Sequence, residues 1–202
     1  MTDLPITYVP NFIANPDVAL RTLQTELEWE RRSDAPRGEY YCNETGEAYT
    51  YGNGIGRRTY LARPYHAVIL DIRKQLEEYV STAFPAVKPV FEVCFLNRYL
   101  NQSDHLGWHS DSSPEMDDAR PIATISLGVE REIWFRPNGK ENLENITKLK
   151  LGDGSMCLMH PGMQDTHQHR IPKASFQCLE RISLTFRGYV QSKDLNEGTR
   201  KP

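Results

Sequence analysis

A histidine and an aspartate two positions apart are the first residues whose types and spacing suggest chemistry. His109 and Asp111 close the polar segment Asp104–Asp111, and in an extended chain two side chains at this spacing point to the same face. A second histidine from a distant strand would complete a set of two histidines and one carboxylate, which binds Fe(II) and leaves coordination positions open. His167 and His169 are both candidates, since they are also two apart. A structural, hydrogen-bonded His–Asp pair is the alternative.

Two arginines in one predicted strand suggest an anionic ligand. Arg181 and Arg187 are six residues apart and therefore share a face, while Ile182, Leu184 and Phe186 occupy the other face. Two guanidinium groups inside a protein are costly without anions. A dicarboxylate would satisfy both, because the guanidinium fork pairs bidentately with a carboxylate. The alternatives are a solvated face or pairing with acidic residues of the chain.

Seven β-rich runs in the second half of the chain would position these residues. Short runs joined by turn signals are typical of a sandwich or barrel rather than of βαβ units. The runs are Phe91–Leu100, Ile122–Leu127, Arg131–Arg136, Asn145–Leu151, Ser155–Met159, Thr166–Ile171 and Arg181–Val190. The first run carries Asn97 and Tyr99, again two apart, which could donate neutral hydrogen bonds to the ligand of the arginines.

Two helices are predicted ahead of these strands. The first begins at Asn15-Pro16, because Asn suits the N-cap and Pro the first helical position, and its apolar stripe ends near Arg32. The second begins at Pro64 and ends near Phe84. The sequence thus predicts a mainly β (α+β) chain that forms one domain over residues 1–202, with the helices in 1–89 and the β core in 90–191.

Composition narrows the class of protein. The 202 residues include 24 Lys+Arg and 27 Asp+Glu, a net charge of −3, and 39% hydrophobic residues, which suits a globular chain and not a disordered one. No apolar run approaches the roughly 18 residues of a membrane span, so no membrane partner is expected. The four cysteines form no CxxC pair and no secretion signal is evident, which favours a reducing compartment: the cytoplasm, or the nucleus in a eukaryote.

The order of these residues resembles the AlkB family of Fe(II)/2-oxoglutarate dioxygenases. The matching segments are Asn97–Tyr99, His109–Asp111, Gln168–Pro172 and Arg181–Arg187. The resemblance covers residues 90–188 strongly and 36–63 more loosely. It implies a double-stranded β-helix (jelly roll) with two N-terminal helices packed on it, and it implies Fe(II), 2-oxoglutarate and O2 as cofactor and cosubstrates.

The resemblance also implies roles for individual residues. The implied iron ligands are His109, Asp111 and His169. The implied cosubstrate contacts are Asn97, Tyr99, Arg181 and Arg187. His169 is preferred to His167 because the family's ligand precedes a short turn that ends in proline, here Pro172. Arg181 would pair with the distal carboxylate of 2-oxoglutarate, and Arg187 would act near its metal-chelating end.

The implied substrate is an N-alkylated base, such as 1-methyladenine or 3-methylcytosine, in DNA or also RNA. Its demethylation releases formaldehyde, succinate and CO2. Because the alkyl group lies on the Watson–Crick edge, the base must be single-stranded or flipped out of a duplex. Tyr49 and Tyr51 resemble the family's base-cradling hairpin, with Tyr51 as the stacking ring; plain packing is the alternative. Arginines that could contact phosphates flank this hairpin: Arg37, Arg57, Arg58 and Arg63.

Two departures from the family keep other functions open. Ser113 stands where many repair members have an acidic residue that contacts the base, and Ser183 stands where the family often has Asn. The alternatives are a dioxygenase of the same fold that acts on tRNA, protein or a small molecule, and a non-catalytic jelly-roll protein that binds a metal. A monomer is expected. Trp134 is expected to be a core or packing residue, and Trp108 to lie in the core rather than to act in catalysis.

Overall fold

The computed structural model describes the chain except residues 1–3, 34, 52–56, 115, 140–144 and 190–202. Its strands are β1 (Ile6–Val9), β2 (Gly38–Asn43), β3 (Tyr49–Tyr51), β4 (Arg58–Tyr60), β5 (Val93–Tyr99), β6 (Leu106–His109), β7 (Ile122–Gly128), β8 (Arg131–Pro137), β9 (Thr147–Leu151), β10 (Ser155–Met159), β11 (His167–Ile171) and β12 (Arg181–Arg187). Its helices are α1 (Pro16–Glu26), α2 (Ala67–Ala83) and α3 (Met163–Thr166). All seven strands predicted from the sequence are present.

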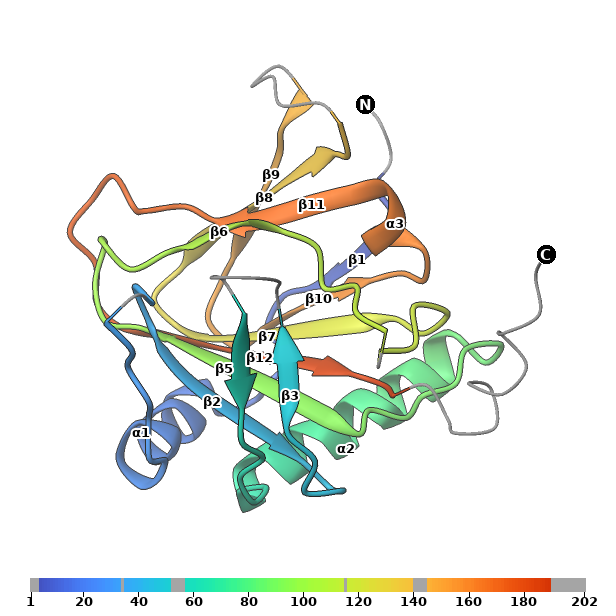
Figure 1. The fold of residues 1–202 in the computed structure, drawn as a ribbon, viewed down its shortest axis with the longest axis horizontal. Coiled ribbons are helices and arrows are strands. Elements are labelled where there is room, and N and C mark those ends of the chain that lie inside the picture. The colour runs from blue at the N-terminus through green and yellow to red at the C-terminus, as the bar shows by residue number, and fades with distance from the viewer. Residues whose placement is uncertain (1–3, 34, 52–56, 115, 140–144, 190–202) are drawn as a thin grey trace.

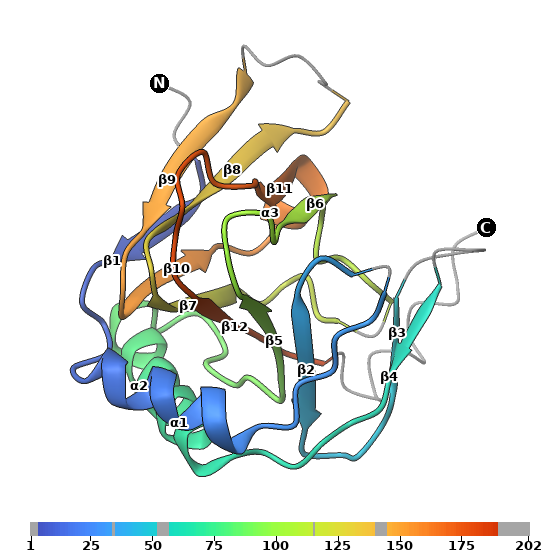
Figure 2. The same ribbon diagram turned by 90° about the vertical axis from the view of Figure 1, so that its left-hand side faces the viewer.

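Two antiparallel sheets face each other (Figure 1). The larger sheet has the strand order β1-β10-β7-β12-β5-β2, and the smaller has the order β6-β11-β8-β9. Apolar side chains from both sheets, such as Ile122 of β7 and Phe135 of β8, share one core cluster between them. A two-stranded hairpin, β3–β4, stands beside β2 (Figure 2). The predicted mainly β jelly roll is confirmed.

The central strand β12 separates the core from the interior of the jelly roll. It pairs with β7 on one side and β5 on the other. Ile182, Leu184 and Phe186 join the core cluster beneath the helices. Arg181 and Arg187 lie on the opposite face, which lines a cavity between the sheets. The alternation that the sequence predicts for this strand is therefore observed.

The helices α1 and α2 cover the outer face of the larger sheet (Figure 2). Leu23 of α1 and Ile69, Leu76 and Val80 of α2 are fully buried in the same cluster as Leu96 of β5. The helical periodicity of their apolar residues provides this buried face. The two helices thus support the sheet from behind and leave its inner face free for polar side chains.

The first helix is shorter than its apolar pattern predicts. It ends at Glu26 rather than near Arg32, because Leu27 adopts an extended backbone with φ −89° and ψ 139°. Beyond it, Glu30 pairs with Glu39 of β2 in an isolated bridge. Tertiary pairing has therefore overridden a local periodicity that continues past the helix.

The second helix begins later than predicted. Its first residue is Ala67 rather than Pro64, because His66 is the N-cap and its Nδ1 accepts the backbone N–H of Val68 at 3.2 Å. The sequence pattern also does not predict β1, β4, β6 or α3. These elements have only three or four residues each, too few for a recognisable period.

Two expectations about packing have different outcomes. All four cysteines are buried and free, as their spacing predicts. The expectation that Trp108 belongs to the core is wrong, since this residue is half-buried and lies against Arg136. Trp134 is also half-buried and packs against Arg170. Among the described residues, no helix is both long enough and apolar enough to cross a membrane.

Candidate active site

Three side chains of the metal-ligating type meet inside the smaller sheet. His109 ends β6 and His169 lies in β11, directly opposite each other in the antiparallel register. The two carboxylate oxygens of Asp111 lie 3.6 Å from the Nε2 atoms of His109 and His169 respectively. The three ligand atoms lie within 4.8 Å of one another, so a single ion can contact all of them. His167, the other candidate, lies outside this group.

Two neighbouring groups orient these ligands. Nδ1 of His109 lies 2.9 Å from the carbonyl oxygen of Gly107, and since a carbonyl only accepts, Nδ1 carries the proton. The lone pair on Nε2 therefore faces the group, as metal ligation requires. Gln164 of α3 accepts the backbone N–H of Asp111 through Oε1 at 2.9 Å. The position of the carboxylate is thus fixed from the backbone side as well.

Electrostatics keep the ligands in the protonation states that bind a cation. Burial alone would raise the pKa of Asp111, but Arg187, followed by the two histidines, outweighs burial and lowers it. The Nη2 atom of Arg187 donates to Oδ1 of Asp111 at 2.8 Å. Burial, together with the neighbouring His109, lowers the pKa of His169 to about 3. At neutral pH the group therefore consists of two neutral imidazoles and one carboxylate.

Arg181 is a buried cation without an anion. Its side chain is fully buried, and its Nε donates to Ser126 Oγ at 2.7 Å. Its two terminal nitrogens have no hydrogen-bond partner among the described residues, and neither does the hydroxyl of Tyr99, whose ring lies 5.3 Å from the guanidinium. Burial lowers the pKa of Arg181 to about 10, an effect that Tyr99 opposes and Arg131 strengthens. Such a group calls for a carboxylate ligand.

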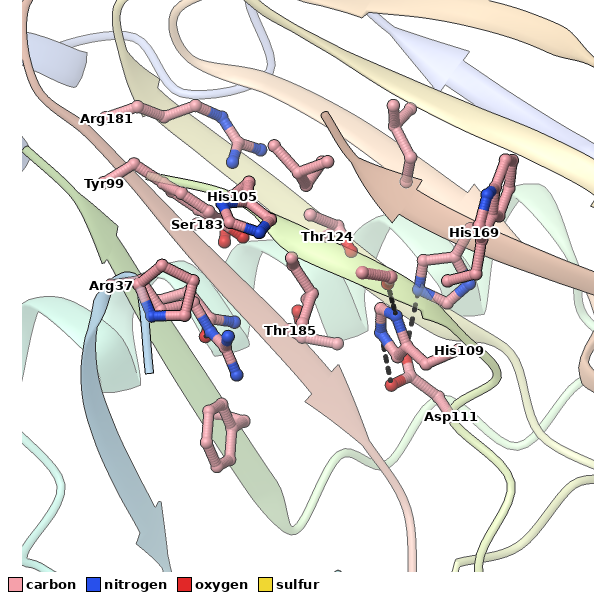
Figure 3. Close-up of a pocket in the computed structure, with 18 of the residues that line it drawn as sticks. Arg37, Tyr99, His105, His109, Asp111, Thr124, His169, Arg181, Ser183 and Thr185 are labelled. Atoms are coloured by element: carbon pink, nitrogen blue, oxygen red, sulfur yellow. Dashed lines mark hydrogen bonds and ion pairs between the residues drawn. The ribbon is translucent and has the colours of Figure 1, made fainter. Parts of the chain in front are cut away.

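One cavity of about 390 Å³ connects the two features. Figure 3 shows Arg181 at the opposite end of this cavity from His109, Asp111 and His169. The volume lies within the usual range of roughly 300–1,000 Å³ for small-molecule sites. Most of the site residues predicted from the sequence line it: Tyr49, Arg58, Asn97, Tyr99, His109, Asp111, His169, Arg181 and Arg187.

Arg37, which the sequence leaves as a phosphate contact or as part of a solvated loop, is not solvated. Its side chain is buried in the cavity wall, where Nε donates to Oδ1 of Asn97 and Nη2 to Oε1 of Glu39, both at 2.6 Å. A buried carboxylate holds this arginine inside, which the polar character of its neighbours in the sequence does not indicate. Asn97 does line the cavity as predicted, with its side-chain oxygen engaged by Arg37.

The aromatic hairpin lies at the cavity as predicted. Tyr49 is buried and stacks on Tyr60 with the ring centroids 6.3 Å apart. Arg58 lines the cavity at 4.0 Å from Glu39, whereas Arg57 is exposed and lies outside the lining. Tyr51 ends β3, but its side chain lies outside the described residues.

Several cavity residues are not predicted from the sequence. Thr185 of β12 and its register partner Thr124 of β7 line the cavity, as does Ser183, which the sequence singles out as a departure from the family. The signal for Thr185 is the two-residue period that starts at Arg181, because alternate residues of a strand share a face. Gln164 has no such signal, since it reaches Asp111 from a separate short helix.

The fold and the site together define a class of protein. A jelly roll whose inner face presents two histidines and one carboxylate, beside a cavity with open space, matches the facial triad of mononuclear non-haem iron oxygenases. The chain belongs to the 2OG-Fe(II) oxygenase superfamily, whose sequence model matches residues 6–187.

Comparisons with individual proteins place the chain beside the AlkB homologues. The Bos taurus "Alpha-ketoglutarate-dependent dioxygenase alkB homolog 3" is 32% identical over 186 residues, which cover 85% of this chain and 60% of that protein. The Mus musculus "DNA oxidative demethylase ALKBH2" is 28% identical over 180 residues, covering 87% and 70%. This chain thus spans 60–70% of the length of these relatives. The solved structure of OsALKBH1, 14% identical, shares the fold with a TM-score of 0.66, over 93% of this chain and 100% of that one.

The residues present fit the groups that the superfamily's name implies. Two imidazole nitrogens and a carboxylate are a suitable donor set for Fe(II), and Asp111 supplies the negative charge. The unpartnered terminal nitrogens of Arg181 fit the distal carboxylate of 2-oxoglutarate. The cavity between them offers room for the rest of the cosubstrate.

Proposed function

We propose that this protein is an Fe(II)/2-oxoglutarate-dependent dioxygenase that oxidatively demethylates N-alkylated bases, such as 1-methyladenine and 3-methylcytosine, in DNA and also in RNA. One observation carries the proposal: the cavity has a metal-type triad at one end and the buried, unpaired guanidinium of Arg181 at the other. The base as substrate is supported by the names of the AlkB homologues that the chain resembles.

In this proposal the side chains bind and orient the reactants. His109, Asp111 and His169 hold the iron, and Arg187 keeps the Asp111 carboxylate ionised and directed at it. Arg181 pairs with the distal carboxylate of 2-oxoglutarate, and the Tyr99 hydroxyl lies beside that pair. Bound iron and 2-oxoglutarate supply the oxidising power from O2, with succinate and CO2 as products. The hydroxylated methyl group then leaves the base as formaldehyde.

The cavity walls protect this chemistry from water. Tyr49, Tyr60 and Phe95 pack their rings together at the hairpin side, and Tyr49 and Tyr60 are each 5% exposed. A target base that enters here has to leave its stack, so a single strand or a flipped-out base is the substrate form. The proposal keeps Tyr49, Tyr51, Arg57 and Arg58 as substrate contacts. The proposal also keeps a monomer as the active unit.

Ser113 is the observation that favours a second candidate function. Its hydroxyl is buried and has no partner among the described residues, and it provides no carboxylate beside the metal group. An exocyclic amine of adenine or cytosine therefore gains no acidic acceptor at this position. A dioxygenase of the same fold that acts on tRNA, a protein or a small molecule is accordingly the alternative.

A panel of substrates tests the proposal. Methylated single-stranded DNA, methylated RNA, methylated nucleosides and a methylated peptide are incubated with Fe(II), 2-oxoglutarate and O2, and formaldehyde and succinate are measured. The proposal predicts equal amounts of both products from the methylated DNA, and none from the His109→Ala variant. Iron-loaded protein that releases no formaldehyde from any methylated DNA or RNA would refute the substrate.

A further inference from the structure

Cations and tryptophans alternate across the outer face of the smaller sheet. The guanidinium of Arg136 lies 4.4 Å from the ring centroid of Trp108, and that of Arg170 lies 4.8 Å from Trp108 and 4.2 Å from Trp134. The ammonium of Lys148 lies 4.2 Å from the Trp134 ring. We call these five residues the cationic ladder. All are within the distance at which a cation attracts an aromatic face.

The sheet register builds this ladder directly behind the metal group. Trp108 precedes His109 and Arg170 follows His169, so ladder residues alternate with the ligands along these two strands. Of the five ladder residues, Trp108 alone also lines the cavity. Trp134 is paired with Arg170 in β11 and with Lys148 in β9. The ladder therefore crosses all four strands, a span of about 14 Å at roughly 4.8 Å per strand.

The two arginines of the ladder lack anionic partners. Arg136 donates to the neutral Gln168 Oε1, at 3.1 Å from Nε and 2.8 Å from Nη2. Arg170 makes no hydrogen bond or ion pair with the part of the chain that the structure describes, and its Nε is buried. Both guanidinium groups lie against the Trp108 ring, so the two cations are close together. Two neighbouring cations in this state are stabilised by an external anion.

Three other exposed or half-buried arginines differ in this respect. Arg31 is paired with Asp104 at 2.7 Å, Arg32 with Glu30 at 2.8 Å and Arg63 with Glu28 at 3.1 Å. Their charges are neutralised within the chain, whose net charge is −3. The ladder thus gathers three cations on one face of a protein whose net charge is negative, and Glu132 on the same strand accepts the indole N–H of Trp134 at 2.7 Å.

The ladder is continuous with the cavity. Trp108 lines the cavity and belongs to the ladder, and β6, which carries it, is an edge strand of the smaller sheet. We propose that the nucleotides flanking the target base lie across this outer face, with their phosphates on Arg136, Arg170 and Lys148. Planar guanidinium groups and indole rings suit phosphates and bases of a single strand, whatever its sequence. This inference rests on the proposed function, since it assigns a path to the same substrate.

Equilibrium binding tests the path without requiring catalysis. A fluorescent, unmethylated single-stranded oligonucleotide is titrated with the wild-type protein, with Arg136→Gln/Arg170→Gln and with Arg136→Lys/Arg170→Lys at several salt concentrations. Each phosphate contact on a single strand contributes about 0.7 to the slope of log K against log[salt], so the glutamine variant is expected to lose about 1.4 and to bind about tenfold more weakly or worse. The lysine variant should keep the slope.

Lys150→Gln is the matched control. Lys150 lies two residues from Lys148 on the same face of β9, but it pairs with Glu130 at 3.2 Å. Its loss is expected to leave affinity and slope unchanged, and thermal melting confirms that each variant is folded. An unchanged affinity of the glutamine variant, or an equal loss in Lys150→Gln, would overturn the path. So would an acidic peptide that binds as tightly as the oligonucleotide through the same arginines.

The outcomes separate this inference from the proposed function. Protein that binds the oligonucleotide through the ladder but releases no formaldehyde from its methylated form supports the path and contradicts the demethylase. Protein that demethylates the oligonucleotide equally well with and without the two arginines supports the demethylase and contradicts the path. If both the path and the demethylase activity are correct, Arg136→Gln/Arg170→Gln raises the KM for a methylated oligonucleotide. The same variant leaves turnover of a methylated mononucleotide unchanged.

Discussion

The two ends of the cavity differ in how their charges are balanced. At the metal end, the carboxylate of Asp111 accepts a hydrogen bond from Arg187, and the two histidines are neutral at neutral pH. At the far end, Arg181 is fully buried with its terminal nitrogens unpartnered among the described residues. The metal group is therefore assembled by the chain alone, whereas the far end is completed only by an anionic ligand.

This difference separates residues that stabilise the folded protein from residues that bind the ligand. An internal ion pair such as Asp111–Arg187 is costly to break, because either partner left alone is a buried charge. In the ligand-free protein Arg181 is already a buried charge without a partner. It gains a favourable interaction only when a carboxylate binds. The two arginines of β12 are six residues apart and share a face. We nevertheless expect substitution of Arg187 to destabilise the ligand-free protein and substitution of Arg181 not to do so.

The largest expected effect is the loss of activity in Asp111→Ala. Removal of this ligand also removes the only carboxylate of the metal group, so turnover should fall by more than the roughly 10–100-fold that loss of an outer partner of a ligand costs. Succinate production and Fe(II) affinity measure the change. His167→Ala, which alters a nearby residue of the same strand, is the control and should retain both. Full activity of Asp111→Ala would show that the group is not the metal site.

Next in size is the destabilisation of the ligand-free protein by Arg187→Met. The substitution leaves the Asp111 carboxylate buried without its partner, and breaking such a pair costs about 3–5 kcal/mol. Urea denaturation of metal-free protein gives the free energy of unfolding. A value equal to that of the wild type would mean that the two ends of the cavity do not differ as described.

Arg181→Met should leave the ligand-free protein as stable as the wild type, or about 1 kcal/mol more stable. Removing the unpaired buried donors of Arg181 should stabilise the folded protein by about 1–3 kcal/mol. Loss of the hydrogen bond to Ser126 offsets much of this gain. The same denaturation experiment measures it. A destabilisation as large as that of Arg187→Met would indicate that Arg181 already has a partner within the chain.

An effect of similar size, near neutral pH, is a dependence of stability on pH. The pKa of His169 is lowered from 6.5 to about 3 in the folded protein, so the unfolded chain takes up a proton first as the pH falls below 6.5. Metal-free protein should therefore lose about 1 kcal/mol between pH 7 and pH 5.5, and the loss should continue toward pH 3. Melting temperatures across this range test it, with His169→Asn expected to lose less. Identical pH profiles would contradict the burial of a neutral imidazole.

The sequence predicts the strands and the site better than it predicts the residues at which the helices begin and end. Regular alternation locates β12 and both of its arginines, because one period governs a whole strand. Helix α1 is predicted too long because its apolar spacing continues to a residue, Leu27, whose backbone is extended by tertiary pairing. The periodicity of apolar residues indicates which residues can be buried, but it does not indicate the residue at which a helix ends.

The errors within and behind the site have a common physical origin. The sequence leaves Arg37 as a phosphate contact or as part of a solvated loop, yet Asn97 of β5 and the nearby Glu39 hold it inside. Trp108 is expected in the core, yet it lies against arginines on the outer face, as Trp134 does. Glu39 is only two residues from Arg37, but Asn97 and the arginines of the tryptophans come from strands distant in sequence, and only the register of the sheets brings them to their partners.

The most direct test of the central claim pairs a truncated ligand with a truncated side chain. Binding of 2-oxoglutarate and of 2-oxobutyrate, which lacks the distal carboxylate, is measured by calorimetry on Mn(II)-loaded wild type and Arg181→Met without O2. A charged hydrogen-bonded pair contributes about 1.5–3 kcal/mol, so the wild type should prefer 2-oxoglutarate by about 10–100-fold and the variant should not discriminate. An equal preference for 2-oxoglutarate in both proteins would contradict the assignment of Arg181 and the orientation of the cosubstrate in the cavity.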